Sequence, residues 1–328
     1  MSMEFMKFKL AVVVGMAALL AGCSSVTYVD VNVLHAPEIG TGHYKRIYIA
    51  DFKNLSLVPN LHDRISYGVT RALQSIGRLD VIDNAVYGSL LGPKDLHNDD
   101  LLVLTGVVTR GIADQEVVKG EPYKDKDSDR DTTKPGREKE MERHVDYTRT
   151  VNVKYEVQFT LTRAADAKVL AMPIIAGEVS DSKTLRDEAP KRFDLEEYSH
   201  RAETQIIDDF IHRVSPWREI VRVEFLTDDD MPELERGIDA ARHQNWEGAE
   251  FSFQQAVTSH PTLKSEQLAK AHYDLGLARE FIYHFDEARA SLKRAADLDR
   301  SASVYARAIG ECSYREADHR RLHDQGWE

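Results

Sequence analysis

Hydrophobic and polar positions follow two regular patterns between residues 44 and 226. From Val151 to Leu161 apolar residues alternate with polar ones, which predicts a strand with one buried and one solvated face. Apolar residues recur at helical spacing from Leu61 to Ile76 and from Leu195 to Val214, which predicts two helices. Shorter apolar runs predict further strands, at residues 46–52, 80–83, 101–108, 169–179 and 221–225. This order predicts an α/β domain, a mixed sheet covered by helices, to which the last strand returns.

Residues 231–328 follow a different pattern, in which small and aromatic residues repeat. A glycine, an alanine, an aromatic residue, a second alanine and a proline come in order: Gly237, Ala249, Phe253, Ala256 and Pro261. Four of these positions recur 39 residues later, at Gly276, Ala288, Leu292 and Ala295. Small residues let two helices approach, and stacked helix pairs bury what one pair cannot bury alone. The pattern resembles tetratricopeptide (TPR) repeats and implies an all-α domain of helical repeats, with two full repeats and a capping portion near Gly310.

The TPR resemblance also implies a concave face that takes a peptide or a partner helix. Position within the motif selects six candidate partner-binding residues: Arg242, Lys270, Tyr273, Glu280, Arg307 and Tyr314. At each position the alternative is an exposed residue without a partner. With so few repeats, the domain could instead pack on the first domain or on a neighbouring copy.

The first 25 residues contain an apolar run with charges before it and a cysteine after it. Lys7 and Lys9 precede the run from Leu10 to Gly22, and Cys23 follows it. The run is too short for the roughly 20 residues of a membrane-spanning helix. It resembles a bacterial lipoprotein signal peptide, which implies that residues 1–22 are removed and that Cys23 is acylated on its thiol and its amino group. Several acyl chains at about 0.8 kcal/mol per buried methylene would make the anchor permanent. An ordinary signal peptide with an incidental cysteine is the alternative.

The residue after the cysteine bears on localisation. In lipoproteins of this kind an aspartate there commonly retains the protein at the inner membrane, whereas Ser24 does not. The resemblance therefore implies a lipid-anchored protein on the periplasmic face of the outer membrane. We expect residues 23–43 to form a largely irregular tether that reaches roughly a few tens of ångströms.

Charge and cysteine content narrow the classes of partner. The formal net charge is −12 at pH 7, and an acidic protein repels phosphate backbones, so nucleic acid is excluded. The two cysteines are Cys23 and Cys312. If Cys23 carries lipid, Cys312 has no disulfide partner within the chain, and we expect it to be a small buried helix residue.

Several segments of the first domain resemble the CsgG/LpoB/PelC-like periplasmic lipoproteins. They are residues 45–54, 79–83, 104–108, 159–161 and 166–170. The resemblance covers most of residues 44–226. It implies a non-enzymatic protein, because members either build oligomeric channels or rings or dock on and activate cell-wall synthases.

A channel of the CsgG type would need two hairpins that cross the membrane. The segments available are residues 114–144 and 180–196, and the first is dense in charge at residues 124–131 and 137–143. A lipid-facing Arg or Lys near the bilayer midplane costs roughly 2 to 4 kcal/mol. We therefore interpret residues of about 113–145 as a charged solvated loop, or one that docks a partner, and favour an adaptor or ring over a secretion channel.

The sequence offers no catalytic constellation. Gly40 and Gly42 precede a predicted strand, whereas a phosphate-binding loop follows one. His319 and His323 are spaced to share a helix face, near Glu316 and Asp318, but two further metal ligands at motif spacing are missing. Asp51 follows the first strand without a matching base or nucleophile, which favours an acid bonded to loop amides.

These patterns support one functional hypothesis and two alternatives. We expect a non-enzymatic adaptor or scaffold in an envelope complex for secretion, polymer export or wall synthesis. Its partners would be envelope proteins or peptides in the TPR groove, and it could form a homo-oligomer. We expect no metal, and no cofactor apart from the covalent lipid on Cys23. The alternatives are an oligomeric secretion-channel component and a hydrolase that uses Asp51 or the His319 and His323 pair.

Overall fold

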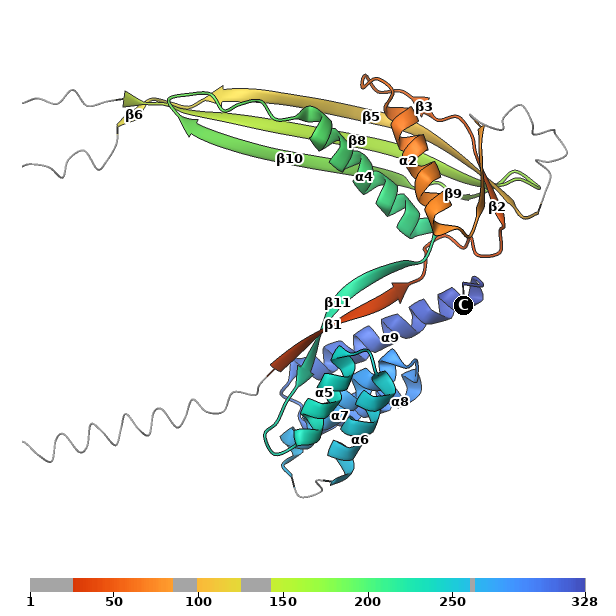
Figure 1. Cartoon of the computed structure of the whole chain (residues 1–328), viewed down its shortest axis with the longest axis vertical. Coiled ribbons are helices and arrows are strands. Elements are labelled where there is room, and N and C mark those ends of the chain that lie inside the picture. Colours follow the sequence, from red (N-terminus) through yellow and green to blue (C-terminus); the bar gives the residue numbers. More distant parts are fainter. Residues whose placement is uncertain (1–25, 85–98, 125–142, 260–262, 328) are drawn as a thin grey trace, which may run out of the picture. The chain divides into compact units, whose positions relative to one another are not determined.

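The computed structural model divides the chain into two compact units (Figure 1). The structure describes residues 26–84, 99–124, 143–259 and 263–327. We call Pro37–Pro216, together with Gln325–Trp327, the α/β unit. Among the described residues, the helical unit comprises Val26–Ala36 and Trp217–Asp324. Among the described residues, no helix is both long and apolar enough to span a membrane.

A mixed sheet forms the centre of the α/β unit, as the sequence predicted, and it has seven strands among the described residues. The strand order is β10-β8-β5-β2-β4, with β3 paired to β5 and β9 paired to β8. β2 is parallel to β4 and β5, whereas the β5–β8, β8–β9 and β8–β10 pairs are antiparallel. The strands are β2 (Arg46–Ile49), β3 (Lys53–Asn54), β4 (Asp80–Asp83), β5 (Leu101–Lys119), β8 (Asp146–Arg163), β9 (Lys168–Ala171) and β10 (Ile174–Arg186).

Two helices of the described residues cover the sheet and bury its apolar face. α2 (Leu61–Ile76) and α4 (Leu195–Val214) pack on each other, and α4 also packs on β8 and β10 (Figure 1). The alternation predicted for residues 151–161 is confirmed, because every apolar residue in it is buried. Gly177 allows the close approach of α4, since a Cβ there would lie 2.0 Å from the Ala202 carbonyl oxygen.

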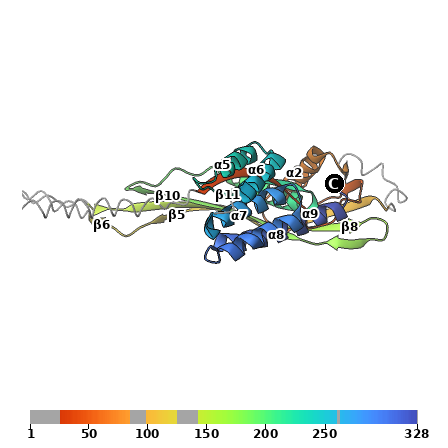
Figure 2. The same cartoon turned by 90° about the horizontal axis from the view of Figure 1, so that it is seen from below.

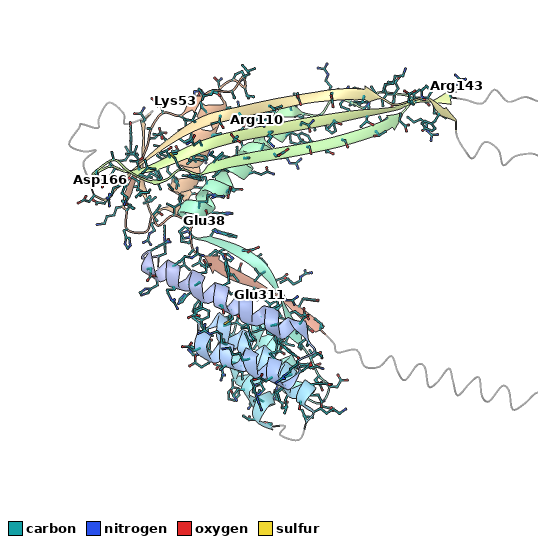
Figure 3. All side chains as sticks on the ribbon, turned by 180° about the vertical axis from the view of Figure 1, so that it is seen from behind. Glu38, Lys53, Arg110, Arg143, Asp166 and Glu311 are labelled. Carbon is teal, nitrogen blue, oxygen red and sulfur yellow. The ribbon has the colours of Figure 1, made fainter. Side chains whose placement is uncertain are left out.

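The strands extend into the segment predicted to be a charged loop. β5 continues to Lys119 and β8 begins at Asp146, and their pairing reaches Lys119 and Tyr147. Figure 3 shows Asp166 at one end of these strands, Arg110 along them and Arg143 at the other end. The prediction of a loop from about 113 to 145 was therefore wrong for residues 113–119. Antiparallel main-chain hydrogen bonds need no buried face, so polar side chains did not end the strands.

The rest of the predicted loop is only partly described. β6 (Tyr123–Lys124) pairs with β7 (Arg143–His144) in a separate two-stranded sheet. Residues 125–142, which carry most of the predicted charge, lie outside the described residues.

In the described part of the helical unit, five helices follow one another. α5 packs on α6, α6 on α7, α7 on α8 and α8 on α9 (Figures 1 and 2). Their bounds are α5 (Pro232–Arg242), α6 (Trp246–Ser259), α7 (Ser265–Phe281), α8 (Phe285–Leu298) and α9 (Ser303–Asp324).

The internal repeat is visible in side-chain packing as well as in sequence. A Cβ at Gly237 would lie 2.3 Å from the Phe253 ring, and one at the equivalent Gly276 would lie 2.6 Å from Leu292. The turns α5–α6 and α7–α8 carry residues with positive φ at equivalent positions, Gln244 and Tyr283. Gly310 has open space beside it, since a Cβ added there would meet no atom of another described element within 4 Å. Two helix pairs therefore repeat one arrangement, and α9 follows them.

A two-stranded ribbon belongs to the helical unit. β1 (Val26–His35) pairs antiparallel with β11 (Trp217–Leu226) in a sheet of their own. The inward residues of both strands lie in the helical core: Val29, Val31, Val33, Val223 and Phe225. We call β1 and β11 together the ribbon.

The ribbon corrects two predictions. Residues 23–43 were expected to be a largely irregular tether, but Val26–His35 is a strand. The strand at 221–225 was expected to return to the α/β sheet, but β11 pairs with β1 alone among the described strands. The physical reason is that Val29, Val31 and Val33 alternate with polar residues and so give β1 an apolar face, which the helices bury. The predicted domain boundary near residue 226 therefore differs from the unit boundary at Trp217.

Candidate functional site

The ribbon covers part of the helical face that the sequence predicted to be an open groove. It packs on α5, α7 and α9. Of the six predicted partner-binding residues, Tyr273, Arg307 and Tyr314 line a cavity of about 650 Å³, and Glu280 lines a second cavity of about 200 Å³. Arg242 and Lys270 line neither of these cavities. The structure thus brings together only part of the predicted set.

Two of the predicted residues donate hydrogen bonds to backbone carbonyls of this chain. Lys270 Nζ donates to the Thr227 carbonyl at 3.2 Å and lies 2.9 Å from Asp228 Oδ2. The Tyr273 hydroxyl donates to the Glu224 carbonyl at 3.0 Å, and the Tyr273 side chain is buried. Burial raises its pKa far above the usual tyrosine value. Both residues therefore fix the end of β11 and the segment after it.

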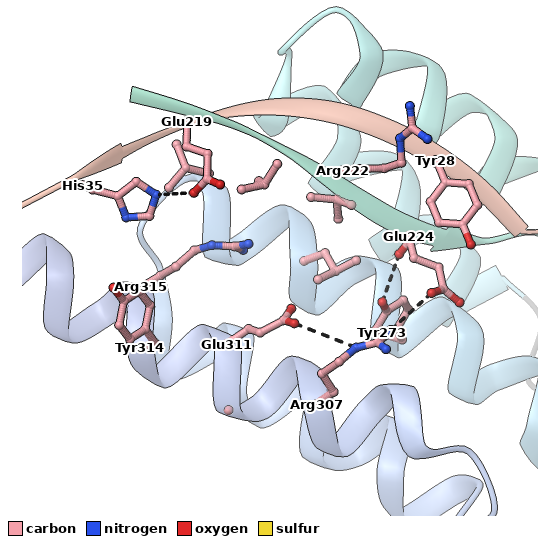
Figure 4. Close-up of a pocket in the computed structure, with 15 residues that line it drawn as sticks. Tyr28, His35, Glu219, Arg222, Glu224, Tyr273, Arg307, Glu311, Tyr314 and Arg315 are labelled. Atoms are coloured by element: carbon pink, nitrogen blue, oxygen red, sulfur yellow. Dashed lines mark hydrogen bonds and ion pairs between the residues drawn. The ribbon is translucent and has the colours of Figure 1, made fainter. Parts of the chain in front are cut away.

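The larger cavity is a groove between β11 and α9 (Figure 4). β11 contributes Glu219 and the run Val221–Glu224 to one side. α9 contributes residues at helical spacing to the other side: Arg307, Gly310, Glu311, Tyr314 and Arg315. Tyr273 and Leu277 of α7 lie between them, and Tyr28 and His35 of β1 also line it. We call this cavity the ribbon groove.

The ribbon groove carries charges of both signs. Arg307 lies 3.2 Å from Glu224 and 3.8 Å from Glu311, and Figure 4 shows all three at one end of the groove. Toward the other end His35 Nε2 lies 3.2 Å from Glu219. Partly exposed ion pairs contribute only about 0 to 1 kcal/mol each. A ligand can therefore replace one member of such a pair at small cost.

Aromatic rings form one part of the lining of the second cavity. Trp246 stacks on Phe281 with centroids 4.4 Å apart, and Tyr283 stacks on His319 at the same distance. The Arg315 guanidinium lies 4.8 Å from the Phe281 ring centroid. These contacts join the two helix-pair turns to α9, so the cavity belongs to the packing of the repeat.

Two buried acids lie beside these cavities. Glu280 is 1% exposed and pairs with Arg315. Burial raises its pKa to about 7, against the opposing charge of Arg315. Asp274 is fully buried, and burial raises its pKa well above the usual value although its Oδ1 accepts from the Leu226 N–H at 3.0 Å. Both carboxyl groups are thus bound by groups of the helical unit itself, Arg315 and the Leu226 N–H.

The remaining candidate residues have ordinary structural partners. Asp51 accepts from Asn84 Nδ2 at 2.7 Å. Asp318 accepts from the Ala36 N–H at 3.2 Å and lies 3.0 Å from His35 Nδ1. In the described part of the chain, no three His, Cys, Asp or Glu side chains gather as a metal site would require.

Cys312 is a buried free thiol, as the sequence predicted, and burial raises its pKa to about 12. Cys23 and Ser24, the predicted lipidation and sorting residues, lie outside the described residues.

Sequence reasoning missed the ribbon and therefore the groove beside it. The signal was present, since Val29, Val31 and Val33 alternate with Asp30 and Asn32. No local feature of the sequence predicts that this strand pairs with one about 190 residues later, at the register Val31↔Val221.

Neither a protein-family model nor a curated protein matches this chain. Among solved structures, it is similar to lipoprotein GNA1162 from Neisseria meningitidis, with 18% identity, a TM-score of 0.23, and coverage of 42% of this chain and 83% of that one. It is also similar to a PelC dodecamer from Paraburkholderia phytofirmans, with 14% identity, a TM-score of 0.26, and coverage of 58% and 98%.

A third similar structure is a neuraminyllactose-binding hemagglutinin homolog from Helicobacter pylori. The identity is 8%, the TM-score 0.32, and the coverage 54% of this chain and 88% of that one. At these TM-scores, none of the three carries a conclusion on the fold or function of this chain.

Proposed function

We propose that this chain is an envelope lipoprotein, anchored through lipid on Cys23, that acts as a non-enzymatic scaffold. The observation that carries the proposal is the position of the lipidation motif. The apolar run ends at Gly22, Cys23 follows it, and β1 begins at Val26, three residues after Cys23. The lipid would therefore be joined almost directly to a folded strand of the helical unit.

The short link has a geometric consequence. Three residues span at most roughly 10 Å, because a fully extended chain advances about 3.3–3.6 Å per residue. The expected tether of residues 23–43 gave a reach of a few tens of ångströms. The Val26 end of the ribbon would therefore lie close to the membrane surface. Ser24 favours the periplasmic face of the outer membrane as the site of anchoring.

The two units support a scaffold in different ways. We classify the repeated helix pairs as TPR-like and the α/β unit as CsgG/LpoB/PelC-like, from the sequence motifs given above. The helical unit offers an open, charged groove beside a strand, whose size suits a polypeptide segment. The proposal assigns no cofactor, and the candidate acids have structural partners.

Metabolic labelling with an alkyne fatty acid tests the anchor. We expect the full chain to be labelled and to fractionate with membranes. Cys23→Ala should lose the label and remain uncleaved at this site, since the modified residue is missing. Cys312→Ser is the matched control and should keep the label, because Cys312 is a buried helix residue.

Label retained in Cys23→Ala would contradict the lipid anchor. The scaffold role is tested separately, by in-cell cross-linking and mass spectrometry on the labelled protein. We expect a defined protein partner or a second copy of the chain. A pure oligomer that conducts ions across planar bilayers would favour the secretion-channel alternative instead.

A further inference from the structure

The backbone of β11 has an edge that faces away from β1. The Leu226 N–H donates to Asp274 Oδ1, and the Glu224 carbonyl accepts from the Tyr273 hydroxyl, each at 3.0 Å. Alternate residues of a strand direct their backbone groups to the same side. Arg222 and Ile220 therefore point their N–H and carbonyl groups to this outer edge as well.

At Arg222 and Ile220 the outer edge is unpaired. Among the described residues β11 pairs with β1 alone, and no hydrogen bond links the backbone of Arg222 or Ile220 to another element. The Arg222 side chain, 3.4 Å from Asp30, leaves that backbone free. Unpaired N–H and carbonyl groups on a strand edge form a template for another strand.

The ribbon groove runs along this unpaired edge. Its lining includes Arg222, Val223 and Glu224 on β11 and faces α9 across the cavity (Figure 4). The cavity volume of about 650 Å³ lies within the range of about 300–1,000 Å³ that is typical of ligand sites. The stretch from Glu219 to Glu224 is roughly 20 Å long at about 3.4 Å per residue. A single strand of about six residues matches that length.

We propose that an extended segment of a partner protein binds in the ribbon groove as a third strand, hydrogen-bonded to the backbone of β11 at Arg222 and Ile220. The proposal deepens the scaffold function and rests on it only for the envelope location. Main-chain hydrogen bonds supply affinity in this binding mode, and side chains supply specificity.

The walls of the groove define the chemistry of the segment. Its side chains on the α9 side meet Arg307, Glu311 and Arg315, so charged or polar residues of both signs fit there. Tyr28 and Tyr314 are more than half exposed at the groove, and exposed tyrosines are typical contact residues at protein interfaces. Neighbouring strands of a sheet lie about 4.8 Å apart, so a folded sheet from a second copy would place its second strand against α9. An isolated extended segment fits better.

Selection from a random ten-residue peptide library against the full chain in detergent provides the probe. We expect selected peptides to bind Arg222→Pro roughly tenfold more weakly than Arg222→Ala, since both lack the guanidinium and only proline lacks the N–H; tenfold corresponds to about 1.4 kcal/mol. Arg222→Pro should fold, because the lost N–H makes no bond to β1 and proline is tolerated on strand edges. Circular dichroism checks this.

Hydrogen exchange gives a second readout that needs no variant. Added peptide should slow exchange at the Arg222 and Ile220 amides and leave Val221 and Val223 unchanged, because these already pair with β1. N-methylation of alternate peptide residues should abolish binding in one register only.

Several results would overturn the proposal. One is equal peptide binding by Arg222→Pro and Arg222→Ala. Another is unchanged hydrogen exchange at the Arg222 amide when peptide is added. A third is a selection that yields no binding peptide. Concentration-dependent dimerisation that Arg222→Pro abolishes would identify a second copy as the occupant instead. Peptide binding that persists when Cys23 proves unlabelled would remove the envelope location and leave the ribbon groove assignment intact.

Discussion

The carboxyl group of Glu280 is buried inside the helical unit, and only one of its two oxygens has a partner in the part of the chain that the structure describes. Its side chain pairs with Arg315, but Oε2 is buried without a hydrogen-bond partner among the described residues. Burial raises its pKa to about 7, so the folded protein holds a proton that the unfolded chain releases at lower pH. The group therefore links stability to pH.

The sign of this effect follows from the direction of the shift. The ordinary pKa of Glu is 4.5 and the folded value is about 7, so the native state binds more protons between these pH values. Stability contributed by the protonated form is lost as pH rises from about 4.5 to about 7, by up to about 3 kcal/mol. We expect the free energy of unfolding, measured in urea, to fall less steeply between these pH values for Glu280→Gln than for the unchanged protein.

Glu287→Gln is the matched control for that measurement. Glu287 is exposed in the first turn of α8, so its loss should leave the pH dependence unchanged. Because Asp274 also has a raised pKa, the informative quantity is the difference between Glu280→Gln and the unchanged protein. Equal slopes for these two proteins would show that Glu280 ionises normally.

At the residue scale, the sequence predicted packing better than exposure. The repeat assigned Gly237 and Gly276 to helix contacts, and both face a side chain of the paired helix. The same repeat assigned Tyr273 and Glu280 to an accessible concave face, and both are buried. A motif fixes which side of a helix a residue occupies, but a distant strand that covers this side leaves no mark within the motif.

At the element scale, β1 acts as a part of the helical core. Val31 is 1% exposed and faces the helices, whereas Asp30 is exposed on the opposite face. Val31→Ala removes two buried methyl groups, so we expect the helical unit to lose about 1–3 kcal/mol of unfolding free energy. Chemical denaturation monitored by helical circular dichroism measures this loss.

Asp30→Ala serves as the comparison on the same strand. It removes only an exposed ion pair with Arg222, which is worth about 0 to 1 kcal/mol. If residues 23–43 were an irregular tether, neither substitution would change stability. Equal effects of the two variants on stability would therefore contradict the assignment of β1 to the helical core.

At the scale of the whole molecule, the helical unit is discontinuous in sequence. The chain leaves it at Ala36, builds the α/β unit from Pro37 to Pro216, and re-enters it at Trp217. Both connections leave the same end of the ribbon, where His35 pairs with Trp217. Because β11 is synthesised after the whole α/β unit, β1 can pair with it only once the chain has been made as far as β11.

A fragment of residues 217–324 tests this discontinuity. Without β1 the edge of β11 loses its partner strand and the core loses Val29, Val31 and Val33, so we expect the fragment to bind the dye ANS and to unfold at lower temperature. A synthetic peptide of residues 26–36 should reverse both changes in trans. A peptide with Val29, Val31 and Val33 replaced by serine is the control, and equal rescue by this peptide would contradict the role of the ribbon.

The sequence by itself determined the elements that carry a strong local period. The alternation at Val151–Leu161, the two helices of the α/β unit and the repeated helix pairs follow from side chains within one element or its neighbour. Tertiary structure alone decided where β1 and β11 belong and which helix faces stay open. The physical reason is that strand pairing across about 190 residues depends on backbone groups, which are the same in every residue, and on a helical surface that exists only after folding. The groove beside Arg222 arises from that pairing.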